Sequence, residues 1–162
     1  MSDTYAPQLE PISFLIGTWA GNGAGEYPTI ESFTYTEELR FWTVGMKPQL
    51  AYTQTTWLPD GRPSHGEMGY WRPLEGGRGI ELVLSHPTGV AEIAEGTVVG
   101  QLVELETTSI GRTATAKEVT TLRRRYEVEG DRLRYDLWMA AVGQPISHHL
   151  GGELVRSAEV RG

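Results

Sequence analysis

The chain contains no cysteine among its 162 residues. This absence excludes disulfide bonds, zinc fingers, iron–sulfur clusters, thiolate-ligated haem and covalently attached c-type haem. No covalent crosslink is needed, however, because a domain of this length can bury roughly 68–70% of the surface that its unfolded chain exposes. The length therefore suits one domain with its own hydrophobic core.

Positive charge and long apolar runs are also scarce. The chain has 21 acidic and 14 basic residues, for a formal net charge of −7. Binding to nucleic acids or anionic membranes depends mainly on summed positive charge, so we expect neither partner. The one basic cluster, Arg123-Arg124-Arg125, fits a strand whose alternate residues are solvated.

Two sorting signals are missing as well. No apolar run approaches the roughly 20 residues that cross a bilayer. The first residues lack the basic segment followed by an apolar stretch that marks a signal peptide. We therefore expect a cytoplasmic protein.

Glycine, by contrast, is abundant, with 20 residues. It separates short segments in which apolar and polar residues alternate, the pattern of half-buried strands. The segment from Phe33 to Phe41, for example, has its aromatic residues and Leu39 on one face. Turn sequences such as Pro59-Asp60-Gly61, Pro87-Thr88-Gly89 and Glu129-Gly130-Asp131 join such segments. Connections this tight predict antiparallel hairpins.

This pattern predicts eight to ten strands between Thr18 and Arg156. Closing the sheet into a barrel removes its exposed edges, and a barrel of this size can enclose one small ligand. The predicted fold is all-β: a closed antiparallel up-and-down β-barrel of about ten strands with a short N-terminal helix. We expect the barrel domain at 8–156, with flexible tails at 1–7 and 157–162.

The helix is predicted near the N-terminus, where apolar residues form a stripe: Leu9, Ile12, Leu15 and Ile16. Pro7 and Pro11 limit its length. We expect it to cover one end of the barrel.

The chain has four histidines, His65, His86, His148 and His149. Because adjacent strand residues point to opposite faces, only one of His148 and His149 can enter the barrel, and alternation alone does not decide which. No His-x-His or HExxH spacing supports a zinc site, and no Gly-x-Ser-x-Gly motif indicates a serine hydrolase. Glu37 and Glu38 should lie on opposite faces and cannot form a carboxylate pair.

The stretch Gly17-Thr18-Trp19-Ala20-Gly21-Asn22-Gly23-Ala24-Gly25-Glu26-Tyr27-Pro28 is the most unusual part of the sequence. It does not match a phosphate-binding loop, because Glu26 stands where that fingerprint needs glycine and no βαβ unit surrounds it. A first strand with an inward tryptophan fits better. Its glycines would serve either close packing at the barrel closure or contact with a ligand, and both interpretations stay open.

The same stretch, Gly-x-Trp-x-Gly-x-Gly-x-Gly-x-Tyr-Pro, resembles the signature of the nitrobindins, ferric haem proteins with a ten-stranded barrel. Further similar segments are 33–38, 65–70, 81–87, 116–120, 139–145 and His149-Leu150. The resemblance extends over nearly the whole chain.

The resemblance implies one non-covalent haem b per chain, with His149 as the iron ligand. It places Thr29 at the haem and Lys117 near a propionate. It also implies that the protein stays ferric, binds nitric oxide, and isomerises peroxynitrite to nitrate at an open Fe(III) position opposite His149.

We expect this open side to be mostly apolar, and we expect Met68, Tyr70, Leu82, Leu84 and Met139 to supply part of the apolar wall around the haem. The expected partners are peroxynitrite and nitric oxide, and the protein should be a monomer or homodimer. Two other functions stay open: a carrier of a fatty acid or other apolar ligand, and a haem or nitric oxide sensor without turnover.

Overall fold

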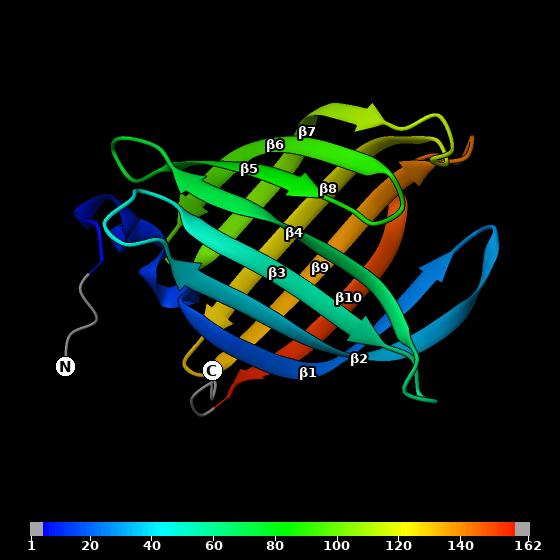
Figure 1. Cartoon of the computed structure of the whole chain (residues 1–162), viewed down its shortest axis with the longest axis horizontal. Helices are drawn as coiled ribbons and strands as arrows, with labels where there is room; N and C mark the ends of the chain where they lie inside the picture. The colour runs from blue at the N-terminus through cyan, green and yellow to red at the C-terminus, as the bar shows by residue number, and fades with distance from the viewer. Residues whose placement is uncertain (1–4, 158–162) are drawn as a thin grey trace.

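Ten antiparallel strands form a closed barrel in the computed structural model, which describes residues 5–157 (Figure 1). Each strand pairs with the next along the chain, and the first pairs with the last. This arrangement confirms the predicted fold class. The strands are β1 (Gly17–Tyr27), β2 (Ile30–Thr43), β3 (Leu50–Trp57), β4 (Pro63–Pro73), β5 (Gly79–Ser85), β6 (Val90–Val99), β7 (Leu102–Arg112), β8 (Val119–Glu129), β9 (Arg132–Ala141) and β10 (Ser147–Arg156).

The parts of the two predicted tails at 1–4 and 158–162 lie outside the described residues. Inside the barrel domain, the three predicted turns each join two paired strands. Gly61, Gly89 and Gly130 have φ values of 85°, 91° and 59°, which glycine adopts without steric cost. The hairpins are therefore short, as the sequence predicts.

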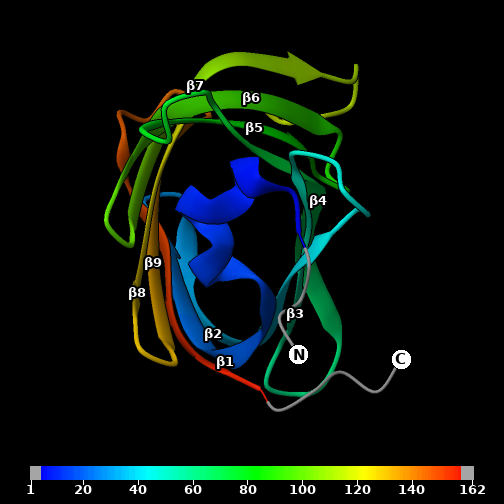
Figure 2. The ribbon, with the colours of Figure 1, turned by 90° about the vertical axis from the view of Figure 1, so that its left-hand side faces the viewer.

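The N-terminal helix η1 (Pro7–Leu15) is a 3-10 helix that lies across one end of the barrel (Figure 2). Leu9, Ile12 and Leu15 are fully buried. Their spacing of three residues matches a helix with three residues per turn, which places all three on one face. The indole nitrogen of Trp19 donates a hydrogen bond to the carbonyl of Leu15 at 2.9 Å and so ties the helix to β1. Within residues 5–157, no helix has the length and apolarity to span a membrane.

Alternation along β2 places Tyr35, Glu37, Leu39 and Phe41 in the interior, while Glu38 points outward. In β8 the same alternation leaves Arg123 and Arg125 on the outer face. Arg124, between them, is fully buried. The expectation of solvated alternate arginines is thus confirmed, and the middle arginine points into the interior.

The expectation that Met68 and Tyr70 line the interior is wrong, because both are exposed on the outer face of β4. The inward positions of this strand are His65, Glu67 and Trp71 instead. An apolar-inward assignment failed here because a buried carboxylate occupies an inward position, where an arginine compensates its charge.

The glycines of β1 occupy inward positions between Trp19 and Tyr27. A Cβ on Gly21 would overlap the backbone carbonyl of Glu153 in the neighbouring β10. A Cβ on Gly25 would overlap the ring of Phe33 in β2. The glycine stretch therefore provides close packing at the seam where the barrel closes.

Candidate functional site

A cavity opens at the barrel end opposite η1. Its lining includes residues near the loops of that end, among them Ser64 before His65, Thr88 between β5 and β6, and Met139 near the end of β9. The cavity has a volume of about 160 Å³ and opens to solvent on one side, so it is smaller than the roughly 300–1,000 Å³ of most small-molecule sites. One side of the wall is apolar, with Phe33, Val90, Val119, Leu122, Leu137, Met139 and Leu150.

A β-bulge directs His149 into this cavity. In the pairing of β10 with β9, His148 lies opposite Trp138 and Leu150 lies opposite Leu137, so His149 is the extra residue between two pairs. Bulges of this kind re-aim a side chain next to a functional site. Both His149 and Leu150 consequently line the cavity, which strict alternation would not allow.

The hydrogen bonding of His149 selects one tautomer. Its Nδ1 lies 2.9 Å from the backbone carbonyl oxygen of Glu26. A carbonyl can only accept, so Nδ1 carries the proton and Nε2 keeps its lone pair. Burial lowers the pKa of His149 below its ordinary value and favours the neutral ring. The edge of the ring packs against Tyr27, with 5.3 Å between ring centroids.

His148 points to the outer face, where its two ring nitrogens contact carboxylates. Nδ1 lies 3.0 Å from Glu26 Oε1, and Nε2 lies 2.8 Å from Asp136 Oδ1. It therefore does not line the cavity, and the bulge gives the adjacent histidines their separate surroundings.

Thr29 and Lys117 are both exposed and do not line the cavity. Thr29 lies in the turn between β1 and β2, and Lys117 lies in the loop between β7 and β8. Both connections are at the end where the cavity opens (Figure 1). The structure thus brings these residues to the same end as His149 without placing them in contact with it.

The expected apolar wall is only partly present. Met139 lines the cavity, whereas Leu82 and Leu84 are buried elsewhere in the core. The remaining wall is more polar than expected, with Thr56, Ser64, His65, Glu67, His86 and Thr88. The cavity thus has one polar side, although most of its exposed lining is apolar.

This polar wall rests on a buried charge network. The Arg124 guanidinium donates to both oxygens of Glu67, from Nη1 to Oε1 at 2.7 Å and from Nη2 to Oε2 at 2.9 Å. Nη2 also contacts Glu92 Oε1. Burial alone would raise the pKa of Glu67, but Arg124 outweighs it and holds that pKa at about 2. The carboxyl groups of Glu67 and Glu92 and the guanidinium of Arg124 thus lie together in the interior.

A second buried carboxyl, Glu37, lies among neutral partners. Gln54 Nε2 donates to Glu37 Oε2 at 2.9 Å, and the Tyr135 hydroxyl donates to the same oxygen at 2.8 Å. Burial raises the pKa of Glu37 to about 7, although these two hydrogen bonds oppose the shift. A Cβ on Gly152 would overlap Glu37 Oε1. This glycine of β10 therefore makes room for the carboxyl.

The sequence did not predict the buried network around Arg124 or the buried carboxyl of Glu37. A signal was present in β8, where Arg124 stands between the inward Leu122 and Tyr126 in a period of two. A charged residue on an apolar face predicts a buried counter-charge. The partners themselves, Glu67 and Glu92, lie too far away in sequence to be identified by spacing.

The residues present at His149 fit a non-covalent haem. Haem iron takes a neutral imidazole whose other nitrogen donates to an acceptor, and the Glu26 carbonyl supplies that acceptor. The free Nε2 belongs to a ring that lines a cavity with an apolar side, as a porphyrin requires.

Comparisons with known proteins identify the family of the chain. The family model described as "THAP4-like, heme-binding beta-barrel domain" matches residues 8–156. A peroxynitrite isomerase 2 from Mycobacterium ulcerans is 52% identical over 157 residues, covering 94% of this chain and 96% of that protein. A peroxynitrite isomerase 1 from Mycobacterium tuberculosis H37Rv is 51% identical over 164 residues, covering 96% of this chain and 99% of that protein.

A solved structure has the same fold. The crystal structure of Rv2717c from M. tuberculosis superimposes with a TM-score of 0.88 at 50% sequence identity, covering 96% of this chain and all of that one. The chain therefore belongs to the THAP4-like haem-binding β-barrel family, the nitrobindins that its glycine–tryptophan motif resembles.

Proposed function

We propose that this protein is a haem-dependent peroxynitrite isomerase that also binds nitric oxide, with one haem b per chain held through His149. The family model is described as haem-binding, and relatives named peroxynitrite isomerases align over nearly the whole chain. The observation that carries the assignment of the ligand is the bulge at His149. It places a neutral imidazole on the cavity wall with Nδ1 held by the Glu26 carbonyl.

Ferric haem held by His149 would supply the Lewis-acid chemistry for the isomerisation of peroxynitrite to nitrate. The chain itself holds and orients this group. The Glu26 carbonyl fixes the proton on Nδ1 and the ring plane of His149, and Tyr27 supports the ring edge. The apolar wall formed by residues such as Leu137 and Met139 excludes water from one side of the cavity.

We assign Thr29 and Lys117 to the rim of the haem site. Their loops flank the cavity opening, and both side chains are exposed there. A lysine ammonium at the rim can pair with a propionate that reaches out to solvent. The support for these two roles is their position at the cavity end together with the family resemblance.

The alternative of a fatty-acid carrier has no observation in its favour. A carrier would need a cation for the ligand's carboxylate, and the buried arginine within residues 5–157 is Arg124. Its guanidinium already binds Glu67 and Glu92. A haem sensor without turnover differs from the isomerase only in its kinetics, so an assay separates the two.

Haem titration of the purified chain tests the ligand. We expect a Soret band that saturates at one haem per chain, its loss in His149→Ala, and its retention in His148→Ala. A parent chain without a Soret band, or a His148→Ala variant that alone loses it, would refute the assignment. His148 is a matched control because it is the neighbouring imidazole on the opposite face.

Stopped-flow mixing with peroxynitrite tests the activity. The ferric protein should speed the decay of peroxynitrite and shift its products toward nitrate. Decay no faster than in buffer would leave a haem sensor as the function. A cytoplasmic location and a monomeric or homodimeric state stay predictions, which cell fractionation and light scattering can check.

A further inference from the structure

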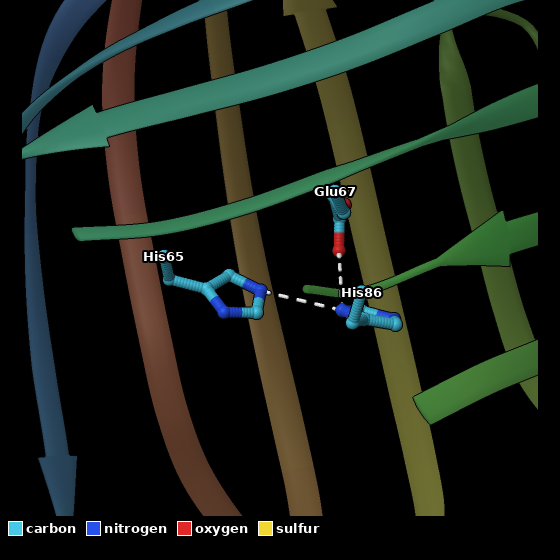
Figure 3. A group of neighbouring side chains, drawn as sticks. All are labelled: His65, Glu67 and His86. Atoms are coloured by element: carbon cyan, nitrogen blue, oxygen red, sulfur yellow. Dashed lines mark hydrogen bonds and ion pairs between the residues drawn. The ribbon is translucent and has the colours of Figure 1, made fainter. Parts of the chain in front are cut away.

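Three potential metal ligands converge on the cavity wall: His65, Glu67 and His86 (Figure 3). His65 and Glu67 are two residues apart in β4, so both point inward. Met68 pairs with Ser85 at the end of β5, which brings His86 next to Glu67. Strand pairing thus assembles a group that no sequence spacing reveals.

Two separations within the group are close to those of a tetrahedral metal site. His65 Nε2 lies 3.3 Å from His86 Nδ1, and His86 Nδ1 lies 3.6 Å from Glu67 Oε2. All three atoms lie within 4.8 Å of one another. Zinc–nitrogen bonds of about 2.0–2.1 Å at tetrahedral angles separate neighbouring ligand atoms by about 3.3–3.4 Å. Little movement is therefore needed to enclose an ion.

We propose that His65 Nε2, His86 Nδ1 and Glu67 Oε2 form a binding site for a divalent transition-metal cation, with Zn²⁺ the best suited. Two imidazoles and one carboxylate are borderline ligands of the kind that zinc prefers. All three residues line the cavity, so the fourth coordination position faces its interior. The site needs only protein atoms and does not depend on the proposed haem function.

Glu92 prepares His86 for this role. His86 Nε2 lies 2.8 Å from Glu92 Oε1, and the carboxylate can only accept, so Nε2 carries the proton. The lone pair of His86 is consequently on Nδ1, the atom that faces His65 and Glu67. A carboxylate that binds the far nitrogen of a ligating histidine is the usual support of a zinc site.

The charge of the buried group also favours a cation. The carboxyl groups of Glu67 and Glu92 share one guanidinium, that of Arg124. Two acidic side chains thus face a single arginine in a buried cluster. Arg124 and the Tyr52 hydroxyl fix the orientation of the Glu67 carboxylate through hydrogen bonds of 2.7–2.9 Å. The ligand is thus held in place before an ion arrives.

Ion binding replaces the hydrogen bond between the two histidines with three coordinate bonds, from His65, His86 and Glu67. Without an ion, His65 Nε2–H donates to His86 Nδ1. When the cation binds, this proton leaves Nε2 and His65 carries its proton on Nδ1, so both facing nitrogens present lone pairs. No redox change or other reactant is involved.

Calorimetric titration of the full chain with ZnCl₂, without added haem, tests the site. We expect one Zn²⁺ per chain with micromolar or tighter affinity. Co²⁺ in its place should give the intense visible bands of four-coordinate cobalt. His65→Ala and His86→Ala should abolish saturable binding, and Glu92→Gln should weaken it about 10–100-fold.

Two control variants test whether zinc binds at another histidine instead. His148→Ala removes a surface imidazole that also contacts two carboxylates, and His149→Ala removes the proposed haem ligand. Both should bind Zn²⁺ like the parent. His65 lies at the cavity wall and is only half-buried, so we expect His65→Ala to fold. If His86→Ala does not fold, His65→Ala alone tests whether the site binds zinc.

The proposal is overturned if the parent binds no Zn²⁺ or if His65→Ala binds it unchanged. It is also overturned if His148→Ala or His149→Ala removes the binding. A chain that binds Zn²⁺ at this site but shows no Soret band with haem would refute the proposed function and leave the metal site intact.

Discussion

Glu37 makes the stability of this barrel depend on pH in a direction opposite to that of most carboxyl groups. Its pKa is raised from 4.5 to about 7 because it is buried among neutral partners. The folded protein therefore binds a proton more tightly than the unfolded chain does. Stability from this group is fully present below pH 4.5 and is lost as the pH rises to 7.

The size of the effect follows from the two pKa values. A shift of 2.5 units, from 4.5 to about 7, corresponds to about 3 kcal/mol at 1.36 kcal/mol per unit. Part of this loss of stability has already occurred at pH 5. Between pH 5 and pH 8 the free energy of unfolding should fall by about 2.5 kcal/mol on account of Glu37 alone.

Glu37→Gln keeps the shape of the side chain and removes its titration. The amide oxygen can still accept hydrogen bonds from Gln54 and Tyr135, as Glu37 Oε2 does now. Urea unfolding of parent and variant at pH 5, 6, 7 and 8 should show the variant gaining about 2.5 kcal/mol relative to the parent across this range. Subtracting the two curves removes contributions from groups common to both, such as His65.

Glu38→Gln is the matched control. It removes the same charge one residue away, on the outer face of β2. Its stability should follow that of the parent at every pH. If Glu37→Gln also runs parallel to the parent from pH 5 to 8, Glu37 does not hold a proton in the folded state, and the argument from burial is wrong.

Three further substitutions test the packing, each by thermal and chemical unfolding followed by circular dichroism. Ile12→Ala should cost about 2–5 kcal/mol, because a fully buried side chain of the covering helix is lost; an unchanged melting temperature would mean that the helix does not seal the barrel. Gly21→Ala should cost at least about 1–3 kcal/mol, because its Cβ would overlap the Glu153 carbonyl, whereas Gly111→Ala meets nothing within 4 Å and should be close to neutral. Arg124→Met should cost about 3–5 kcal/mol by leaving two buried carboxylates without their cation. A variant as stable as the parent would show that Arg124 does not compensate buried negative charge.

The sequence predicted the barrel because its signals are local. Alternation in β2, turn glycines such as Gly61 and the three-residue spacing of Leu9, Ile12 and Leu15 each depend on neighbours within a few positions. Local periodicity is set by strand and helix geometry and needs no knowledge of partners. Strand order then followed from the short connections.

The interior was less predictable because its determinants are distant in sequence. Glu67 and Arg124 are 57 residues apart, and Glu37 and Tyr135 are 98 apart. Assigning apolar residues to the interior therefore failed at β4, where Met68 points outward. The pattern of residue types along the chain does not reveal which polar residue has a partner across the barrel.

The bulge at His149 shows the same limit at the site itself. Leu150, Gly152 and Leu154 point inward, and strict alternation extended backwards would place His148 inward as well. One extra residue reverses this result, and its presence depends on how β10 pairs with β9. The family resemblance selected His149, whereas alternation in the sequence alone left the choice between the two histidines open.

The glycines and the histidine of this barrel belong to one structural arrangement. Gly21 and Gly25 on β1 and Gly152 on β10 present no side chains at the seam, so β2 and its neighbours supply the groups that occupy the space. Phe33 lies over Gly25 and lines the cavity, while Glu37 lies over Gly152 in the core. At the open end of the same seam, the carbonyl of Glu26 on β1 fixes the ring of His149 on β10. The glycines of the family motif thus allow close packing at the seam. This packing positions β1, and the Glu26 carbonyl of β1 orients His149.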